Sequence, residues 1–285
     1  METVDPRPDA LAATVARALA EDHAAADATS LAVVPAEAQA KAEVLVRADG
    51  ILAGRAYAAE TLRQCDPELI QEWFADDGEA VHPGQTVLQV RGAARAILAA
   101  ERCLLNFLQQ LSGVATATAI AVRRAGDMAV LDTRKTVPGL RDAQKEAVVA
   151  GGGRNHRRDL EDQLLLKENH FALSGLDYAE TVRRARAAAA GKVVGAESQT
   201  LDEARLALAA GADYVLLDNF RGEELTAAVR RLRAEFPDAV LEASGGIGLA
   251  QLPQVAACGV DRVSMGALTH SVPSLDLSLM LEPLP

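Results

Sequence analysis

Short apolar runs alternate with helical stretches in the chain from residue 126 onward. The apolar runs cover residues 128–131, 164–166, 193–196, 214–217, 240–243 and 262–265, and the helical stretches include 142–150, 177–190, 201–210, 222–235 and 249–257. This alternation predicts parallel βαβ units, because parallel strands need a crossover connection. The second part of the chain is therefore expected to form an α/β barrel or a doubly wound sheet.

Each apolar run is followed by polar residues or by glycine. The segments concerned are Asp132–Lys135, Lys167–His170, Glu197–Ser198, Asp218–Asn219, Ser244–Gly246 and Gly266. In parallel α/β folds the carboxyl ends of the strands meet at one edge, where ligands bind. A doubly wound sheet would spread these residues along that edge, whereas a barrel would gather them, so the pattern favours a barrel.

The first part of the chain has a mixed composition. Helices are predicted over residues 9–22 and 93–125, with an interruption at Gly113; residues 42–57 indicate a strand, a turn at Asp49-Gly50 and a second strand; and Val87, Leu88 and Val90 mark a further strand. These elements predict a separate α+β domain of about 110 residues.

The net charge of the chain is −11, from 29 basic and 40 acidic side chains. Such a surface repels polyanions, so binding to nucleic acid or to an anionic membrane is not expected. No apolar run approaches the roughly 18 residues of a membrane span, and Met1–Pro8 lacks the apolar segment of a secretory signal. The three widely spaced cysteines, Cys65, Cys103 and Cys258, favour the reducing cytoplasm and no metal cluster.

Two clusters of cations stand out against this acidic background. Thr133-Arg134-Lys135 follows a predicted strand, and Gly151–Gly153 leads into a basic segment with His156 and Arg157. Glycines allow close approach of the backbone to a ligand, and arginine forks match carboxylate or phosphate oxygens. A solvated basic loop is the alternative, but a place at a strand end favours anion binding.

Lys167 directly follows the apolar run 164–166. Because an unpaired ammonium is costly to bury, Lys167 is expected either to face an anion or to be an uncharged amine. The second option would make Lys167 the Schiff-base lysine of a barrel lyase. Both options remain open at this point.

Carboxylates and small-residue turns end the later runs. Glu197 and Asp218 suit Mg²⁺ binding, acid–base chemistry or stabilisation of a ribosyl oxocarbenium ion, and ion pairing with nearby cations is the alternative. Ser244–Ile247 and Met265–Ala267, with His270 close behind, predict a phosphate site built from backbone N–H groups.

Several motifs occur in a fixed order along the chain. They are Glu101-Arg102 with Leu105–Gln109 and Leu111-Ser112-Gly113, then Asp132–Arg141, Gly151–Arg157, Leu166–His170, Gly211-Ala212-Asp213, Leu217-Asp218-Asn219, Ser244-Gly245-Gly246 and Gly266–His270. Each motif alone has low specificity. The ordered set, which extends from about residue 15 to the end, resembles the quinolinate phosphoribosyltransferase family.

The resemblance implies a fold, an assembly and a reaction. It implies an N-terminal α/β sandwich domain over residues 1–112, on which residues 271–285 pack back, and a partly open α/β barrel over residues 113–270. It also implies a homodimer with a shared active site. The reaction would join quinolinate and phosphoribosyl pyrophosphate with Mg²⁺, giving nicotinate mononucleotide, pyrophosphate and carbon dioxide in NAD biosynthesis.

The matched motifs also imply roles for individual residues. Arg134, His156, Arg157 and Lys167 would hold the quinolinate carboxylates with Arg102 of the partner subunit; Thr133 and Lys135 would lie beside them, with Lys135 toward the pyrophosphate; Glu197 and Asp218 would face the ribose and Mg²⁺; and Ser244, Gly245, Gly246, Met265, Gly266, Ala267 and His270 would hold the 5′-phosphate region. The catalytic residues would be Lys135, Lys167, Glu197 and Asp218.

Other functions remain possible on the sequence alone. The family often has Val-Glu-Val-Glu where this chain has Val194-Gly195-Ala196-Glu197, and the missing first glutamate is compatible with a non-catalytic paralogue that binds a phosphorylated metabolite. A paralogue that uses another carboxylate acceptor is a second alternative. The barrel lyase with Lys167 as its Schiff base is a third.

Overall fold

The computed structural model describes residues 8–285, which divide into two compact units. Unit 1 comprises the described residues up to 119 together with 136–152 and 268–285, and unit 2 comprises 120–135 and 153–267. The sequence predicts that Met1–Pro8 is not a secretory signal. Residues 1–7 of this segment lie outside the described residues. Within 8–285, no helix has both the length and the apolar character required to cross a membrane.

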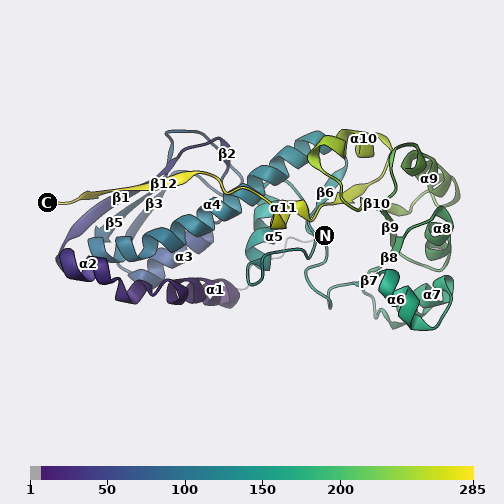
Figure 1. Cartoon of the computed structure of the whole chain (residues 1–285), viewed down its shortest axis with the longest axis horizontal. Helices are drawn as coiled ribbons and strands as arrows, with labels where there is room; N and C mark the ends of the chain where they lie inside the picture. The colour runs from purple at the N-terminus through teal and green to yellow at the C-terminus, as the bar shows by residue number, and fades with distance from the viewer. Residues whose placement is uncertain (1–7) are drawn as a thin grey trace. The chain divides into compact units, whose positions relative to one another are not determined.

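Unit 1 is built on a four-stranded antiparallel sheet with the order β12-β1-β5-β3 (Figure 1). The strands are β1 (Gln39–Val46), β3 (Ile70–Trp73), β5 (Thr86–Ala93) and β12 (Leu277–Pro283). Every second residue of β1 is buried, from Ala40 to Val46, because successive side chains of a strand point to opposite faces. The sheet therefore presents one apolar face, and β12 comes to it from the far end of the sequence.

Helices make up most of the rest of unit 1. They are α1 (Pro8–Glu21), η1 (Ala24–Ala26), α2 (Ala28–Val33), α3 (Arg55–Cys65), α5 (Arg141–Ala150) and the part of α4 (Ala94–Ala125) up to residue 119. Leu62 of α3 and Ile97 and Leu104 of α4 pack with Val44 and Leu88 of the sheet in one apolar cluster. Burial of such side chains is the main favourable contribution to folding.

The hairpin predicted at Asp49-Gly50 is wrong. The short strand β2 (Gly50–Ile51) pairs with β4 (Ala80–Val81), whereas β1 pairs with β5 and β12. The turn signal is local, but the partners of β1 come from distant parts of the sequence. The expected second strand also ends early, because α3 begins at Arg55.

The predicted helices over 9–22 and 93–125 are confirmed, but the expected break at Gly113 is wrong. Helix α4 continues through Gly113 to Ala125. A Cβ atom at residue 113 would clash with the carbonyl of Pro273 and would lie 3.1 Å from Cα of Ser274. Glycine is present here because another backbone segment crosses the helix closely, which is a packing requirement and not a helix stop.

Unit 2 contains a six-stranded parallel sheet with the order β6-β11-β10-β9-β8-β7. The strands are β6 (Ala129–Leu131), β7 (Leu164–Leu166), β8 (Val194–Ser198), β9 (Tyr214–Asp218), β10 (Val240–Ser244) and β11 (Arg262–Ser264). All of the predicted strands are present, and the expected α/β barrel is confirmed. It is open between β6 and β7, the two ends of the strand order.

Helices follow the strands of unit 2, as the crossover rule requires. They are α6 (Glu168–Ser174), α7 (Tyr178–Ala188), α8 (Leu201–Ala209), α9 (Gly222–Glu235), η2 (Leu249–Gln251), α10 (Leu252–Ala257) and α11 (Ala267–His270), the last of which continues into unit 1. Because the six strands are parallel, their carboxyl ends lie at one edge, here called the carboxyl edge. Most of the polar residues predicted for the site follow or end these strands, whereas Arg102, His156, Arg157 and His270 do not.

Candidate active site

Two arginines from neighbouring segments meet at the carboxyl edge. Arg134 follows β6, and Arg157 follows the segment joined to β6 by a parallel bridge between Leu131 and Arg154. The pKa of the Arg157 guanidinium is lowered because the group is buried and because Arg134 is close. Two like charges held together in this way are stabilised when an anion binds beside them, which makes the pair a candidate anion site.

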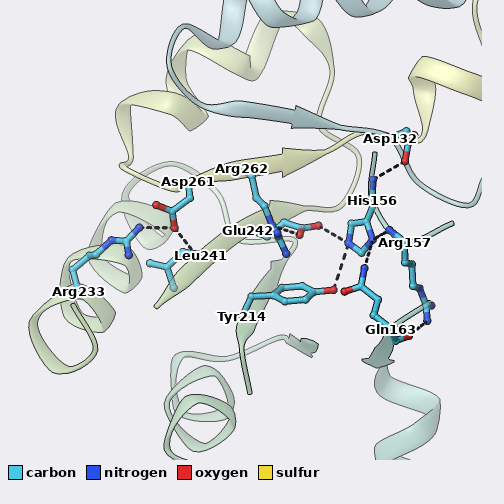
Figure 2. A network of polar contacts seen from close by, with 10 residues as sticks. All are labelled: Asp132, His156, Arg157, Gln163, Tyr214, Arg233, Leu241, Glu242, Asp261 and Arg262. Carbon is cyan, nitrogen blue, oxygen red and sulfur yellow. Dashed lines mark hydrogen bonds and ion pairs between the residues drawn. The ribbon is translucent and has the colours of Figure 1, made fainter. Parts of the chain in front are cut away.

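His156 is held from both ring nitrogens (Figure 2). Its Nδ1 accepts a hydrogen bond of 2.7 Å from the backbone N–H of Arg157, and its Nε2 lies 3.5 Å from Oε1 of Glu242. A backbone N–H can only donate, so Nδ1 acts as the acceptor and Nε2 is the ring nitrogen that carries a hydrogen. The backbone N–H of His156 donates to Asp132 at 2.9 Å, which ties the segment to the end of β6.

Lys167 and two carboxyl groups form a second cluster. The ammonium of Lys167 pairs with Oε2 of Glu197 on the adjacent strand, and the carboxyl groups of Glu197 and Glu168 share a hydrogen bond. Burial raises the pKa of Glu197, Lys167 opposes this, and Glu168 and Asp218 reinforce it. The hydrogen bond from Glu197 lowers the pKa of Glu168. Lys167 is thus an ion-paired ammonium, which disfavours the free amine that a Schiff base requires.

Asp218 ends β9 and lines a hollow of about 270 Å³. The other lining residues are Gln199, Asn219, Phe220 and Glu224. The amide of Asn219 donates to Asp218 at 2.8 Å. The charge of Asp218 acts on Glu197 through space, so the two predicted carboxylates are neighbours at the carboxyl edge.

The turn after β10 requires glycine. Gly245 and Gly246 have φ values of 94° and 60°, in the left-handed region that other residues rarely adopt. A Cβ atom on Gly245 would clash with the side chain of Asn219 and would lie 2.9 Å from its backbone nitrogen. The guanidinium of Arg221 donates to the carbonyl of Gly245. The turn that begins at Ser244 is thereby fixed against the loop after β9.

The remaining predicted residues occupy three places. Thr133 and Lys135 follow β6, where the Thr133 hydroxyl accepts from the backbone N–H of Lys135 at 3.0 Å, and Met265, Gly266 and Ala267 follow β11, where the N–H of Met265 donates to Leu131 at 2.9 Å. Arg102 and His270 belong to unit 1. Arg102 lines a cavity of about 660 Å³ with Arg17, Glu21 and Asp22, and His270 is exposed beside Ser271.

Three charged or polar residues of the strands were missed as part of the site. Glu242 lies within β10, Arg262 opens β11 and Tyr214 opens β9, and all three lie around His156 in Figure 2. A usable signal existed, since a carboxylate inside a buried strand requires a buried partner. The buried partners of Glu242 are His156, Arg262 and Ser264. Burial alone would raise the pKa of Glu242, but the contacts with these three residues hold the pKa below its usual value.

The parallel barrel, with cations and carboxylates at its carboxyl edge, defines the class of α/β-barrel proteins whose candidate site lies at the carboxyl ends of the strands. Comparison with known proteins makes the class specific. The family model for the quinolinate phosphoribosyl transferase N-terminal domain matches residues 27–112, and that for the C-terminal domain matches residues 114–280. The chain belongs to the quinolinate phosphoribosyl transferase family, which is a family of pentosyltransferases.

Individual relatives agree with this assignment. The chain is 40% identical to the probable carboxylating nicotinate-nucleotide pyrophosphorylase of Bacillus subtilis, over 91% of this chain and 89% of that protein. It is 40% identical to the human carboxylating nicotinate-nucleotide pyrophosphorylase, over 88% and 85%. The solved nicotinate-nucleotide pyrophosphorylase of Francisella tularensis superposes with a TM-score of 0.92 at 39% identity and covers 98% of each chain.

Proposed function

We propose that this chain transfers the phosphoribosyl group of phosphoribosyl pyrophosphate to the ring nitrogen of quinolinate, and that it releases pyrophosphate and carbon dioxide to give nicotinate mononucleotide in NAD biosynthesis. The names of the relatives support this reaction. The observation that carries the proposal is the pair Arg134 and Arg157, two guanidiniums held close together at the carboxyl edge of an otherwise acidic protein.

Quinolinate is a planar dicarboxylate, and its recognition requires several cations in fixed positions. Arg134 and Arg157 offer planar forks that bind carboxylate oxygens two at a time. Lys167 adds a compact charge at the end of β7, and the Thr133 hydroxyl adds a neutral donor. His156 contributes by holding the backbone N–H of Arg157 at 2.7 Å. The bound acid thereby replaces the repulsion between the guanidiniums with attraction.

The carboxylates act on the sugar. As the bond from the anomeric carbon to pyrophosphate breaks, positive charge develops on the ribose, and Glu197 and Asp218 stabilise that charge. Lys135 faces the departing pyrophosphate, and the glycine turn from Ser244 to Gly246, with Met265, Gly266, Ala267 and His270, holds the 5′-phosphate. Holding both substrates in place supplies much of the rate.

Mg²⁺ fits this arrangement as a partner of the substrate. Within residues 8–285 no group of three or more His, Cys, Asp or Glu side chains is placed to hold a metal ion. Mg²⁺ in phosphate-transfer sites, however, is commonly bound by one or two carboxylates together with phosphate oxygens and water. Asp218 and Glu197 would hold it with the pyrophosphate, and its charge would neutralise the leaving group.

Decarboxylation follows from the first step. After the new N–C bond forms, the pyridine nitrogen is cationic. The electron pair of the bond between the ring and the adjacent carboxylate can then stay on the ring carbon, stabilised by the neighbouring cationic nitrogen, as carbon dioxide leaves, and it takes up a proton. The arginines hold the other carboxylate during this step, so the chain needs no separate electron sink.

The direct test is an assay of the full chain with quinolinate, phosphoribosyl pyrophosphate and Mg²⁺. We expect nicotinate mononucleotide and carbon dioxide in equal amounts, and no product when nicotinate replaces quinolinate. Borohydride added during turnover is expected to leave Lys167 unmodified by mass spectrometry. Turnover of nicotinate alone would identify another acceptor, and a covalent adduct at Lys167 would identify a lyase. Tight binding without turnover would identify a non-catalytic paralogue.

The paired carboxyl groups predict a pH effect. Glu197 must be ionised to stabilise the ribosyl cation, and its pKa is raised, so kcat/KM for phosphoribosyl pyrophosphate is expected to fall as the pH drops through that pKa. Glu168→Gln removes the neighbouring carboxylate and should lower the pKa of Glu197. The acidic limb of the pH–rate profile should then move to lower pH. Glu180→Gln, at an exposed position of α7, is the control. An acidic limb that does not move in Glu168→Gln would contradict the assignment.

The assembly and the location belong to the same proposal. The chain forms a homodimer, and the exposed Arg102 of unit 1 completes the site of the partner subunit. A guanidinium in this role would add a third fork for the quinolinate carboxylates. The cytoplasm is the proposed location. It is supported by Cys65, Cys103 and Cys258, which are all free thiols.

A further inference from the structure

Tyr214 occupies space that exists because residue 195 is glycine. The two residues are directly opposite each other in the parallel pairing of β8 and β9. A Cβ atom at residue 195 would overlap the Tyr214 ring and would lie 2.5 Å from its Cε1 and Oη atoms. Any side chain at 195 would therefore displace the ring. The space beside Gly195 on β8 is therefore filled by a tyrosine from β9.

The Tyr214 ring is fixed by charged groups from the next two strands. The guanidinium of Arg262 lies over the ring, 4.1 Å from its centroid, and donates to Glu242 at 2.8 Å. The ring is 2% exposed and Glu242 is fully buried. A cation over an aromatic face and a buried ion pair both hold their members in defined positions. The ring therefore cannot move without disturbing the ion pair.

The hydroxyl of Tyr214 reaches His156. Oη lies 3.5 Å from Nε2, and the two rings meet edge to face with centroids 6.1 Å apart (Figure 2). Because Nε2 carries the hydrogen, it is directed toward Oη and the carboxylate of Glu242. The opposite side of the same imidazole holds the backbone N–H of Arg157. A continuous set of contacts thus leads from Tyr214 through His156 to Arg157.

We propose that Tyr214 is a positioning residue for the binding of the dicarboxylate acceptor: with Glu242, its hydroxyl sets the orientation of the His156 imidazole, and His156 in turn sets the place of Arg157 at the carboxyl edge. Gly195 and Tyr214 are a matched pair in this role, since the first makes room for the second. The inference rests on the proposed function, because it assigns Arg157 to the acceptor. It adds a residue that affects the binding of quinolinate through His156 and Arg157 and leaves the binding of phosphoribosyl pyrophosphate untouched.

The first test is Tyr214→Phe, which keeps the ring, its contact with Arg262 and its volume. Loss of one neutral hydrogen-bonding group at this distance is expected to raise the KM and the Kd for quinolinate about fivefold. The KM for phosphoribosyl pyrophosphate and the thermal midpoint should stay unchanged. Tyr178→Phe is the matched control, because its hydroxyl contacts the Glu197 carbonyl and Ser198 and does not reach His156. It should leave the KM for quinolinate unchanged.

The second test separates positioning from packing. Gly195→Ala should lower the thermal midpoint by about 5 °C, because it overpacks the core, and should raise the KM for quinolinate. Adding Tyr214→Val should restore the midpoint but not the KM for quinolinate. If the double variant recovers both, or if Tyr214→Phe binds quinolinate like the unmodified chain, Tyr214 only fills space and the inference is overturned. An inactive unmodified chain would instead overturn the proposed function.

Discussion

Arg134→Ala is expected to lower kcat/KM for quinolinate by about a thousandfold, measured with phosphoribosyl pyrophosphate at saturation. The substitution removes a fork that makes two charge-assisted hydrogen bonds to a carboxylate, each worth about 1.5–3 kcal/mol. It also leaves one carboxylate of the bound acid without its cation. The thermal midpoint should not fall, because the repulsion between Arg134 and Arg157 disappears in the free protein.

Two further variants make this test specific. Arg124→Ala removes an exposed arginine from the same unit and should leave kcat/KM unchanged. Arg134→Lys keeps the charge but loses the planar fork, so its loss should lie between those of the alanine variant and the unmodified chain. If Arg134→Lys and Arg134→Ala lose kcat/KM for quinolinate equally, binding depends on the planar fork of the guanidinium and not on its charge alone. No loss in Arg134→Ala would remove the cation pair from the acceptor site.

The strands of unit 2 could be predicted because their signals are local. Each is a short apolar run bounded by polar residues or glycine, as in Leu164–Leu166 followed by Lys167. A strand covered on both faces, such as β8, is buried throughout and shows no alternation. The ends of such a strand can therefore be recognised only from the polar residues or glycine that bound the apolar run. Many of these bounding residues also belong to the candidate site.

Unit 1 was harder to predict because its order is set at long range. Strand β1 pairs with β12, which lies at the other end of the sequence, and no local turn encodes that pairing. The Asp49-Gly50 signal predicts a hairpin, although the strand after it pairs with Ala80–Val81. Gly113 predicts a helix break, although it reflects the close passage of Pro273 and Ser274. Glycine marks both turns and close packing, and only the tertiary structure separates the two.

The sequence predicts one part of the candidate site and not the other. Its exposed and half-buried charges, such as Arg134, Lys167 and Asp218, were found because they follow strands. The sequence does not predict the buried layer beneath them, because Tyr214 belongs to an apolar strand pattern and Glu242 lies between apolar neighbours. Contacts across β9, β10 and β11 depend on strand order, which a single sequence does not specify. The departure at Gly195 is explained by the same layer.

Two inactive variants are expected to restore activity to each other when their subunits mix. Arg102→Ala should abolish turnover by removing the guanidinium that completes the site of the partner subunit, and Lys135→Ala should abolish it by removing a charge beside the pyrophosphate. Random exchange makes half of the dimers hybrids, and each hybrid has one intact site of two. A mixture of equal amounts, exchanged in mild denaturant and returned to buffer, should therefore recover about one quarter of the original activity.

The choice of variants decides what recovery means. Arg134→Ala and Lys135→Ala both alter residues that follow β6 in unit 2, so every hybrid of that pair carries a defect in each site and should stay inactive. Recovery in the first mixture but not in the second requires that Arg102 act on a site whose other cations belong to another subunit. If neither mixture recovers activity, Arg102 does not contribute to the active site of a partner subunit. It then either acts in its own subunit or takes no part in the reaction, and the cavity that it lines in unit 1 does not bind a partner's substrate.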